Sequence, residues 1–171
     1  MKTRFFLLSA LILLPLVGCS TATLTPVYEE GFAIYLLAEN ISPQLPADPN
    51  LIEIAQHPLL SSKDIVSYTG ATHEIEMTQK GYEAIAALYL PVTGVSFAVC
   101  VNHQPIYAGS FWPGYSSLSF DGIVIDPIFA TMEHPVIQIQ LGYPGSDFFD
   151  QVDPRSDLRI LQALENAGKL R

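Results

Sequence analysis

Two serines, Ser116 and Ser117, lie in residues 114–118 (GYSSL), which begin like the nucleophile elbow Gly-x-Ser-x-Gly. In that motif the second glycine lets a helix pass close to a strand, and here a leucine stands in its place. A loop built from turn residues is the alternative interpretation. A serine hydrolase that uses Ser116 or Ser117, with His103 or His134 as the base, is therefore one hypothesis for the function.

The histidines do not occur at the sequence spacing of known zinc ligands. His73-Glu74 matches the first half of the zinc motif His-Glu-x-x-His, but Met77 occupies the position of the second histidine. The other histidines have no cysteine or acidic residue near them at the spacing of zinc ligands. We expect no catalytic residue, cofactor or metal site from these patterns.

Four aspartates, Asp147, Asp150, Asp153 and Asp157, gather in residues 145–157. Carboxylates in a loop suit calcium, but the central glycine and the final glutamate of an EF-hand are missing. Acids before a helix are also favoured by the helix dipole alone. Calcium binding in this loop stays an open alternative.

The N-terminus has the pattern of an export signal. Lys2 and Arg4 precede an apolar run from Phe5 to Val17 that is shorter than the roughly 20 residues of a membrane span. The run ends in Leu16-Val17-Gly18-Cys19, which resembles the bacterial lipobox, where the cysteine receives diacylglycerol. We expect a signal peptide in residues 1–18, lipid on Cys19, a tether in 19–30 and a single soluble domain in 31–171.

The lipid anchor predicts an address in the cell envelope. Cys19 and its acyl chains would hold the chain on the non-cytoplasmic side of its membrane. Ser20 follows where an aspartate favours the inner membrane of many diderm bacteria, so the resemblance implies the outer membrane in a diderm and the cell surface in a monoderm.

The net charge limits the classes of binding partner, and the cysteine count limits disulfide bonding. Removing residues 1–18 takes away Lys2, Arg4 and no acid, so the net charge changes from −9 to −11. Such a charge excludes nucleic acid, disfavours anionic lipid and favours cationic partners. With Cys19 lipidated, Cys100 has no partner for a disulfide, and its apolar surroundings predict a buried, inert thiol.

Residues 111–115 (FWPGY) concentrate aromatic side chains, including the only tryptophan, among turn residues. If exposed, Trp112 and Tyr115 would form a binding surface for a peptide or a sugar. If buried, the segment would close the core of the sheet. Both interpretations stay open at this point.

Hydrophobic patterning predicts an α+β fold with a mainly antiparallel sheet of five or six strands and two helices packed on it. Residues 95–111 predict a β-hairpin, and Asp121-Gly122 predicts a turn between two short strands. Thr78 is the expected cap of a helix over 79–89. Asp153-Pro154 predicts the start of a terminal helix that ends near Gly168.

Residues 75–125 resemble the head of the periplasmic domain of SecD-type export factors. Both have a strand, a helix, here with Gly81, and an aliphatic hairpin, and Asn102-His103 stands where the family has Asp-Gly. The resemblance implies a ferredoxin-like fold but no translocase role, because those factors act through several membrane helices.

The mature region is also similar to an uncharacterised family of bacterial lipoproteins. The similar segments are residues 64–68 (DIVSY), 72–75 (THEI) and 116–122 (SSLSFDG). That family implies no activity. The expected function is therefore a non-enzymatic binding or accessory module of the envelope, with a possible protein partner there.

Overall fold

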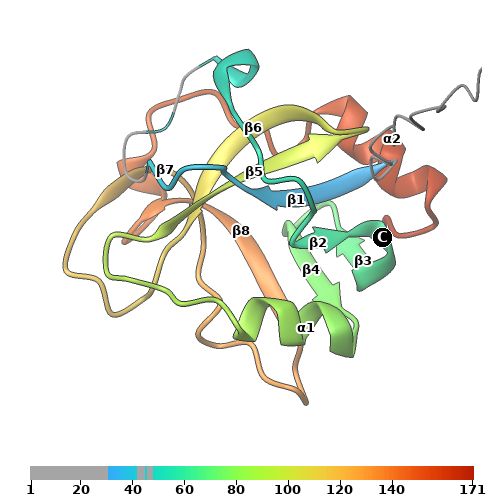
Figure 1. The fold of residues 1–171 in the computed structure, drawn as a ribbon, viewed down its shortest axis with the longest axis horizontal. Coiled ribbons are helices and arrows are strands. Elements are labelled where there is room, and N and C mark those ends of the chain that lie inside the picture. Colours follow the sequence, from blue (N-terminus) through green and yellow to red (C-terminus); the bar gives the residue numbers. More distant parts are fainter. Residues whose placement is uncertain (1–30, 42–44, 46–47) are drawn as a thin grey trace, which may run out of the picture.

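The computed structural model of the chain describes residues 31–41, 45 and 48–171 (Figure 1). In these residues eight strands form one sheet in the order β2-β1-β5-β6-β7-β8-β4-β3. The strands are β1 (Phe32–Leu36), β2 (Leu60–Ser61), β3 (Ile65–Thr69), β4 (Glu74–Met77), β5 (Val95–Val101), β6 (Gln104–Phe111), β7 (Phe120–Ile125) and β8 (Val136–Tyr143). The helices are α1 (Gln79–Ala86), α2 (Leu158–Asn166) and the short 3-10 helices η1 (Pro49–Leu51), η2 (Ser62–Asp64) and η3 (Ser146–Phe148).

This sheet corrects the predicted fold. We expected five or six mainly antiparallel strands, possibly ferredoxin-like, whereas the sheet has eight strands and a parallel pair, β6 and β7. Asp121-Gly122 forms no turn between two strands, because β7 continues through it and pairs with β8 across a register shift. β7 also pairs with β6 in parallel, whereas two strands joined by a tight hairpin turn pair antiparallel.

The sheet curls into a half-barrel because its two edges are joined by three residues. β2 and β3 lie at opposite ends of the strand order, yet only η2 separates them in the chain. Three residues span at most about 11 Å. The two edges must therefore approach each other, and Figure 1 shows β2, β3 and β4 gathered on one side of the molecule.

Asp64 holds this corner. Its carboxylate accepts hydrogen bonds from the backbone N–H (3.0 Å) and the hydroxyl (2.8 Å) of Ser61, and it lies 3.0 Å from the Lys80 ammonium. Burial raises the pKa of Asp64, but the bonds from Ser61 and the charge of Lys80 outweigh it and hold the pKa below its usual value. The Asp64 carbonyl also accepts from the N–H of Thr78, just before α1.

Helix α1 begins where its cap predicts, since the Thr78 hydroxyl accepts from the N–H of Gly81. It ends at Ala86 rather than at the expected residue 89. Gly81 packs against the corner: a Cβ at this position would lie 2.5 Å from the Asp64 carbonyl oxygen. The glycine therefore sets how closely α1 approaches the joined edges.

The hairpin predicted over residues 95–111 is present as β5 and β6. Its two-residue turn consists of Asn102 and His103, both with left-handed backbone (φ 51° and 63°), as in a type I′ turn. The N–H of Gly31 donates to the Asn102 side chain at 2.7 Å, which fixes β1 against the turn.

The main core fills the inside of the curled sheet, with side chains from all eight strands and both α-helices. A second cluster covers the outer face of β1 and β5 and includes Leu37, Ile52 and Cys100. Burial raises the pKa of the Cys100 thiol to about 12, in keeping with the inert thiol expected from the sequence.

Helix α2 starts later than predicted. Its N-cap is Asp157, whose side chain accepts from the N–H of Arg159, and Ile160 and Leu164 face the core. Asp153 is instead bonded by Arg155, so it does not cap the helix. Within the described ranges, every helix is too short or too polar to cross a lipid bilayer.

We predict that replacing Gly81 by alanine lowers the free energy of unfolding by about 1–3 kcal/mol, because the new methyl group overlaps the Asp64 carbonyl. Urea denaturation measures this change. Gly145→Ala is the matched control: a Cβ there meets no atom within 4 Å, so its effect should stay within about 0.5 kcal/mol. Equal effects of the two variants would contradict the packing argument.

Candidate functional site

The candidate site is a group of exposed apolar side chains on three connections: residues 87–94 before β5, 112–119 after β6 and 126–135 after β7. These connections carry seven of the twelve large hydrophobic side chains that are exposed in the described residues, so exposure is concentrated here. We call this group the aromatic loop surface; its members are Tyr89, Val92, Tyr115, Leu118, Ile128, Phe129 and Met132.

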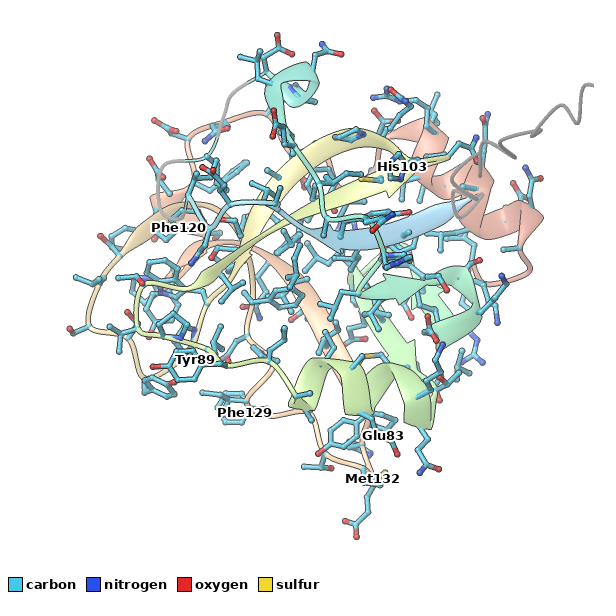
Figure 2. The ribbon with its side chains drawn as sticks, in the orientation of Figure 1. Glu83, Tyr89, His103, Phe120, Phe129 and Met132 are labelled. Atoms are coloured by element: carbon cyan, nitrogen blue, oxygen red, sulfur yellow. The ribbon has the colours of Figure 1, made fainter. Side chains whose placement is uncertain are left out.

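Aromatic rings dominate the exposure. Tyr89 is 87% exposed, Phe129 81% and Tyr115 61%. Figure 2 shows Tyr89, Phe129 and Met132 at the border of the molecule that also carries α1. Soluble domains expose single apolar side chains routinely, but an apolar group this concentrated is typical of a contact surface.

Hydrogen bonds join the first two connections. The Tyr115 hydroxyl donates to the carbonyl of Leu90 at 2.9 Å, and the Ser116 hydroxyl donates to the carbonyl of Val92 at 2.7 Å. The Tyr143 hydroxyl, from the end of β8, donates to the carbonyl of Gly114 at 2.8 Å. These bonds tie the first two connections to each other and to the end of β8.

Gly114 brings the third connection against the second. A Cβ at Gly114 would overlap the Asp126 carboxylate and lie 4.0 Å from the Phe129 ring. Asp126 in turn accepts from the N–H of Ile128 at 3.1 Å. The three connections therefore form one surface, and glycine at position 114 allows the close approach.

The structure separates the two aromatic residues that the sequence grouped. Trp112 is only 1% exposed and stacks on Phe120, with ring centroids 4.9 Å apart and planes 12° apart. Tyr115, three residues later, is exposed. Trp112 therefore supports the loops from the core, and Tyr115 alone lies on the surface.

Sequence reasoning missed Tyr89 and Phe129. Tyr89 was placed at the end of a longer helix, and Phe129 follows a strand without any motif of its own. A signal was nevertheless present, since Pro91 and Pro127 mark both segments as connections in which an aromatic ring has less chance of burial.

The hydroxyl of Ser116 is bonded to backbone groups, and Nδ1 of His134 lies 3.2 Å from the carbonyl oxygen of Glu133. Ser116 is 6% exposed, and its hydroxyl donates to Val92 while accepting from the N–H of Leu118. His103 lies at the other end of β6, whose eight residues extend about 26 Å at about 3.3 Å each. Figure 2 shows His103 far from the loop surface.

Two of the four aspartates in residues 145–157 pair with different arginines. Asp153 pairs with Arg155 at 2.8 Å, and Asp157 pairs with Arg159 at 2.7 Å. Within the described part of the chain, no three His, Cys, Asp or Glu side chains gather in a way that would hold a metal ion.

A groove of about 520 Å³ lies between α2 and the β5–β6 turn, next to Gly31. Two of its polar lining residues are bonded within the protein. Asn102 accepts from Gly31, and the Arg159 guanidinium is held by Asp157.

One buried polar contact of the core joins Tyr68 and His73, with 2.8 Å between the hydroxyl oxygen and Nδ1. Burial lowers the pKa of His73, the Arg155 guanidinium lowers it further and Asp153 opposes both. Burial likewise raises the pKa of Tyr68 to about 12. Tyr68 is 0% and His73 7% exposed, so this pair serves the core and is closed to substrate.

Comparison of the chain with protein-family models, with curated proteins and with solved structures finds no match.

We predict that the protein loses stability as the pH falls below about 6.5, because unfolded His73 then binds a proton that the folded side chain resists. The loss is at most about 1.4 kcal/mol per pH unit for one group. Above pH 6.5 this contribution is fully present. Urea titrations at several pH values measure the slope.

The variant His73→Asn is the control for this pH dependence. Asparagine tolerates the left-handed backbone of His73 (φ 56°) but does not titrate, so the slope of stability against pH below about 6.5 should become shallower. An unchanged slope in the variant would assign the pH dependence to other groups.

Proposed function

We propose that the chain is a lipid-anchored, non-enzymatic binding module of the bacterial cell envelope that contacts another envelope protein through the aromatic loop surface. The observation that carries this proposal is the concentration of exposed aromatic and aliphatic side chains on three hydrogen-bonded loops. Aromatic residues supply most of the affinity at many protein interfaces.

The rigidity of the loops favours binding. Tyr115 and Ser116 tie the connection after β6 to the connection before β5, and Gly114 packs on Asp126. A surface that is already ordered loses little conformational entropy when a partner binds. The apolar area that these side chains bury on binding then contributes to the affinity, and little of that contribution is lost to ordering the loops.

The hydrolase hypothesis has less support from the geometry. A nucleophilic serine needs a base that accepts its proton. The Ser116 hydroxyl instead donates a hydrogen bond to the Val92 carbonyl, and that bond joins two loops of the proposed contact surface. Ser116 therefore has a structural role that suits a binding module.

The membrane anchor rests on the sequence, because residues 1–30, including Cys19, lie outside the described residues. Each buried methylene of an acyl chain contributes about 0.8 kcal/mol, so two or more chains on Cys19 would hold the protein without help from its surface. The aromatic loop surface is then available for a protein partner.

We predict that Cys19→Ser moves the protein from the membrane fraction to the soluble fraction of the cell or leaves its signal peptide uncleaved. Fractionation and mass measurement of the N-terminus test this. Cys100→Ala is the matched control, since Cys100 is buried in the domain and should leave both readouts unchanged. A Cys19→Ser protein that is processed and membrane-bound like the wild type would refute the anchor.

We predict that Tyr89→Ala with Phe129→Ala lowers the yield of partner crosslinked in living cells by about tenfold or more, since aromatic hot spots each contribute 2 kcal/mol or more. Quantitative mass spectrometry of the copurified protein measures the yield. Both residues are more than 80% exposed, so the free energy of unfolding should change by less than about 0.5 kcal/mol.

The matched control is Val152→Ala with Leu158→Ala. These side chains are 90% and 71% exposed but lie outside the three connections. The control pair should keep the wild-type crosslinks. If the aromatic variant also keeps them, the partner binds elsewhere and the proposed surface is wrong.

A further inference from the structure

The charges around the aromatic loop surface have a single sign. All three connections belong to residues 81–154, a stretch with seven acidic residues and no lysine or arginine. Glu133 follows Met132 directly, and Asp126 lies against Gly114 beside Phe129. Figure 2 shows Glu83, on α1, at the same border as Phe129 and Met132.

These carboxylates have no cation to neutralise them within the described residues. Glu83 accepts only from the side-chain amide of Gln79, and Asp126 only from a backbone N–H. The ammonium of Lys80 lies at Asp64, on the corner of the sheet. The apolar surface is therefore bordered by acids whose charge is uncompensated.

From this arrangement we infer that the partner is a protein surface that presents apolar side chains surrounded by lysine or arginine. This inference rests on the proposed function and names the chemistry of the partner. Apolar contacts need to be desolvated in the centre of an interface, while charges of opposite sign at the rim raise the association rate and select the partner.

The same charges disfavour the other occupants of an apolar surface. In a symmetric dimer of this chain, the same face on both copies would bring Glu83 and Glu133 of one copy near the acids of the other. Anionic membrane lipid would also be repelled, because it attracts polybasic segments. A cationic and apolar protein face avoids both costs.

The experiment uses the purified full chain in a non-ionic detergent and two labelled helical peptides of about 18 residues. One peptide has leucine on one face and lysine on the other; the second replaces every lysine by glutamate. Fluorescence anisotropy measures the dissociation constants at about 0.1 M salt, where the Debye length is about 10 Å, and at about 1 M, where it is about 3 Å.

We expect the lysine peptide to bind about tenfold or more tighter than the glutamate peptide at low salt, and this preference to shrink at high salt. Glu133→Lys should weaken binding of the lysine peptide about two- to fivefold, which is the size of one exposed charge pair. Glu165→Lys is the control: Glu165 is exposed on α2, outside the three connections, so this variant changes the net charge by the same amount but should not weaken binding. Phe129→Ala should weaken binding at both salt concentrations.

The possible failures are distinguishable. Equal affinity for the two peptides, with both weakened by Phe129→Ala, would overturn the inference about charge and leave the proposed function standing. Binding of phosphatidylglycerol vesicles, or dimerisation in sedimentation, that is lost in Phe129→Ala would assign the surface to lipid or to a second copy. If neither peptide binds, or Phe129→Ala changes nothing, both proposals fail.

Discussion

The carboxylate of Asp64 is the contact on which the rest of the architecture depends. It accepts two hydrogen bonds from Ser61 and pairs with Lys80, and its backbone carbonyl accepts from Thr78. One buried residue thereby connects β2, η2 and the start of α1. Because β2 and β3 are the opposite edges of the sheet, this corner decides that the sheet curls and encloses its main core. A carboxylate suits this position, since a neutral side chain of similar size would leave the buried N–H and hydroxyl of Ser61 without a charged acceptor.

The curled sheet also explains why the aromatic loop surface lies at one end. β5 starts beside the point where β6 ends, as in any antiparallel pair, and the parallel pairing of β6 with β7 brings the end of β7 to the same place. The connections before β5, after β6 and after β7 are therefore neighbours. A hairpin between β6 and β7 would have sent the end of β7 to the opposite end of the sheet, with Ile128 and Phe129 on it.

Local signals in the sequence predicted local structure well. The cap at Thr78 and the hairpin of β5 and β6 depend on residues a few positions apart, and both are present. The strand count and the parallel pair depend on contacts between distant segments, which periodicity does not encode. Asp121-Gly122 misled because a good turn pair is tolerated inside a strand where the register shifts. The same limit applies to the candidate site. Composition indicated the aromatic segment, but only the fold shows that Trp112 lies in the core and Phe129 outside it.

An exposed apolar surface makes a protein prone to associate with itself, and the acids near this one counter that tendency. Glu83, Asp126 and Glu133 are too far apart in sequence to stabilise one helix or turn together, and no described cation pairs with them. Their shared effect is electrostatic: each disfavours a second copy or an anionic membrane at the same face. The charges that keep the surface soluble are thus the charges that a basic partner would neutralise. In the proposed interaction, solubility before binding and selectivity during binding have one physical cause, which a neutral aromatic surface could not provide.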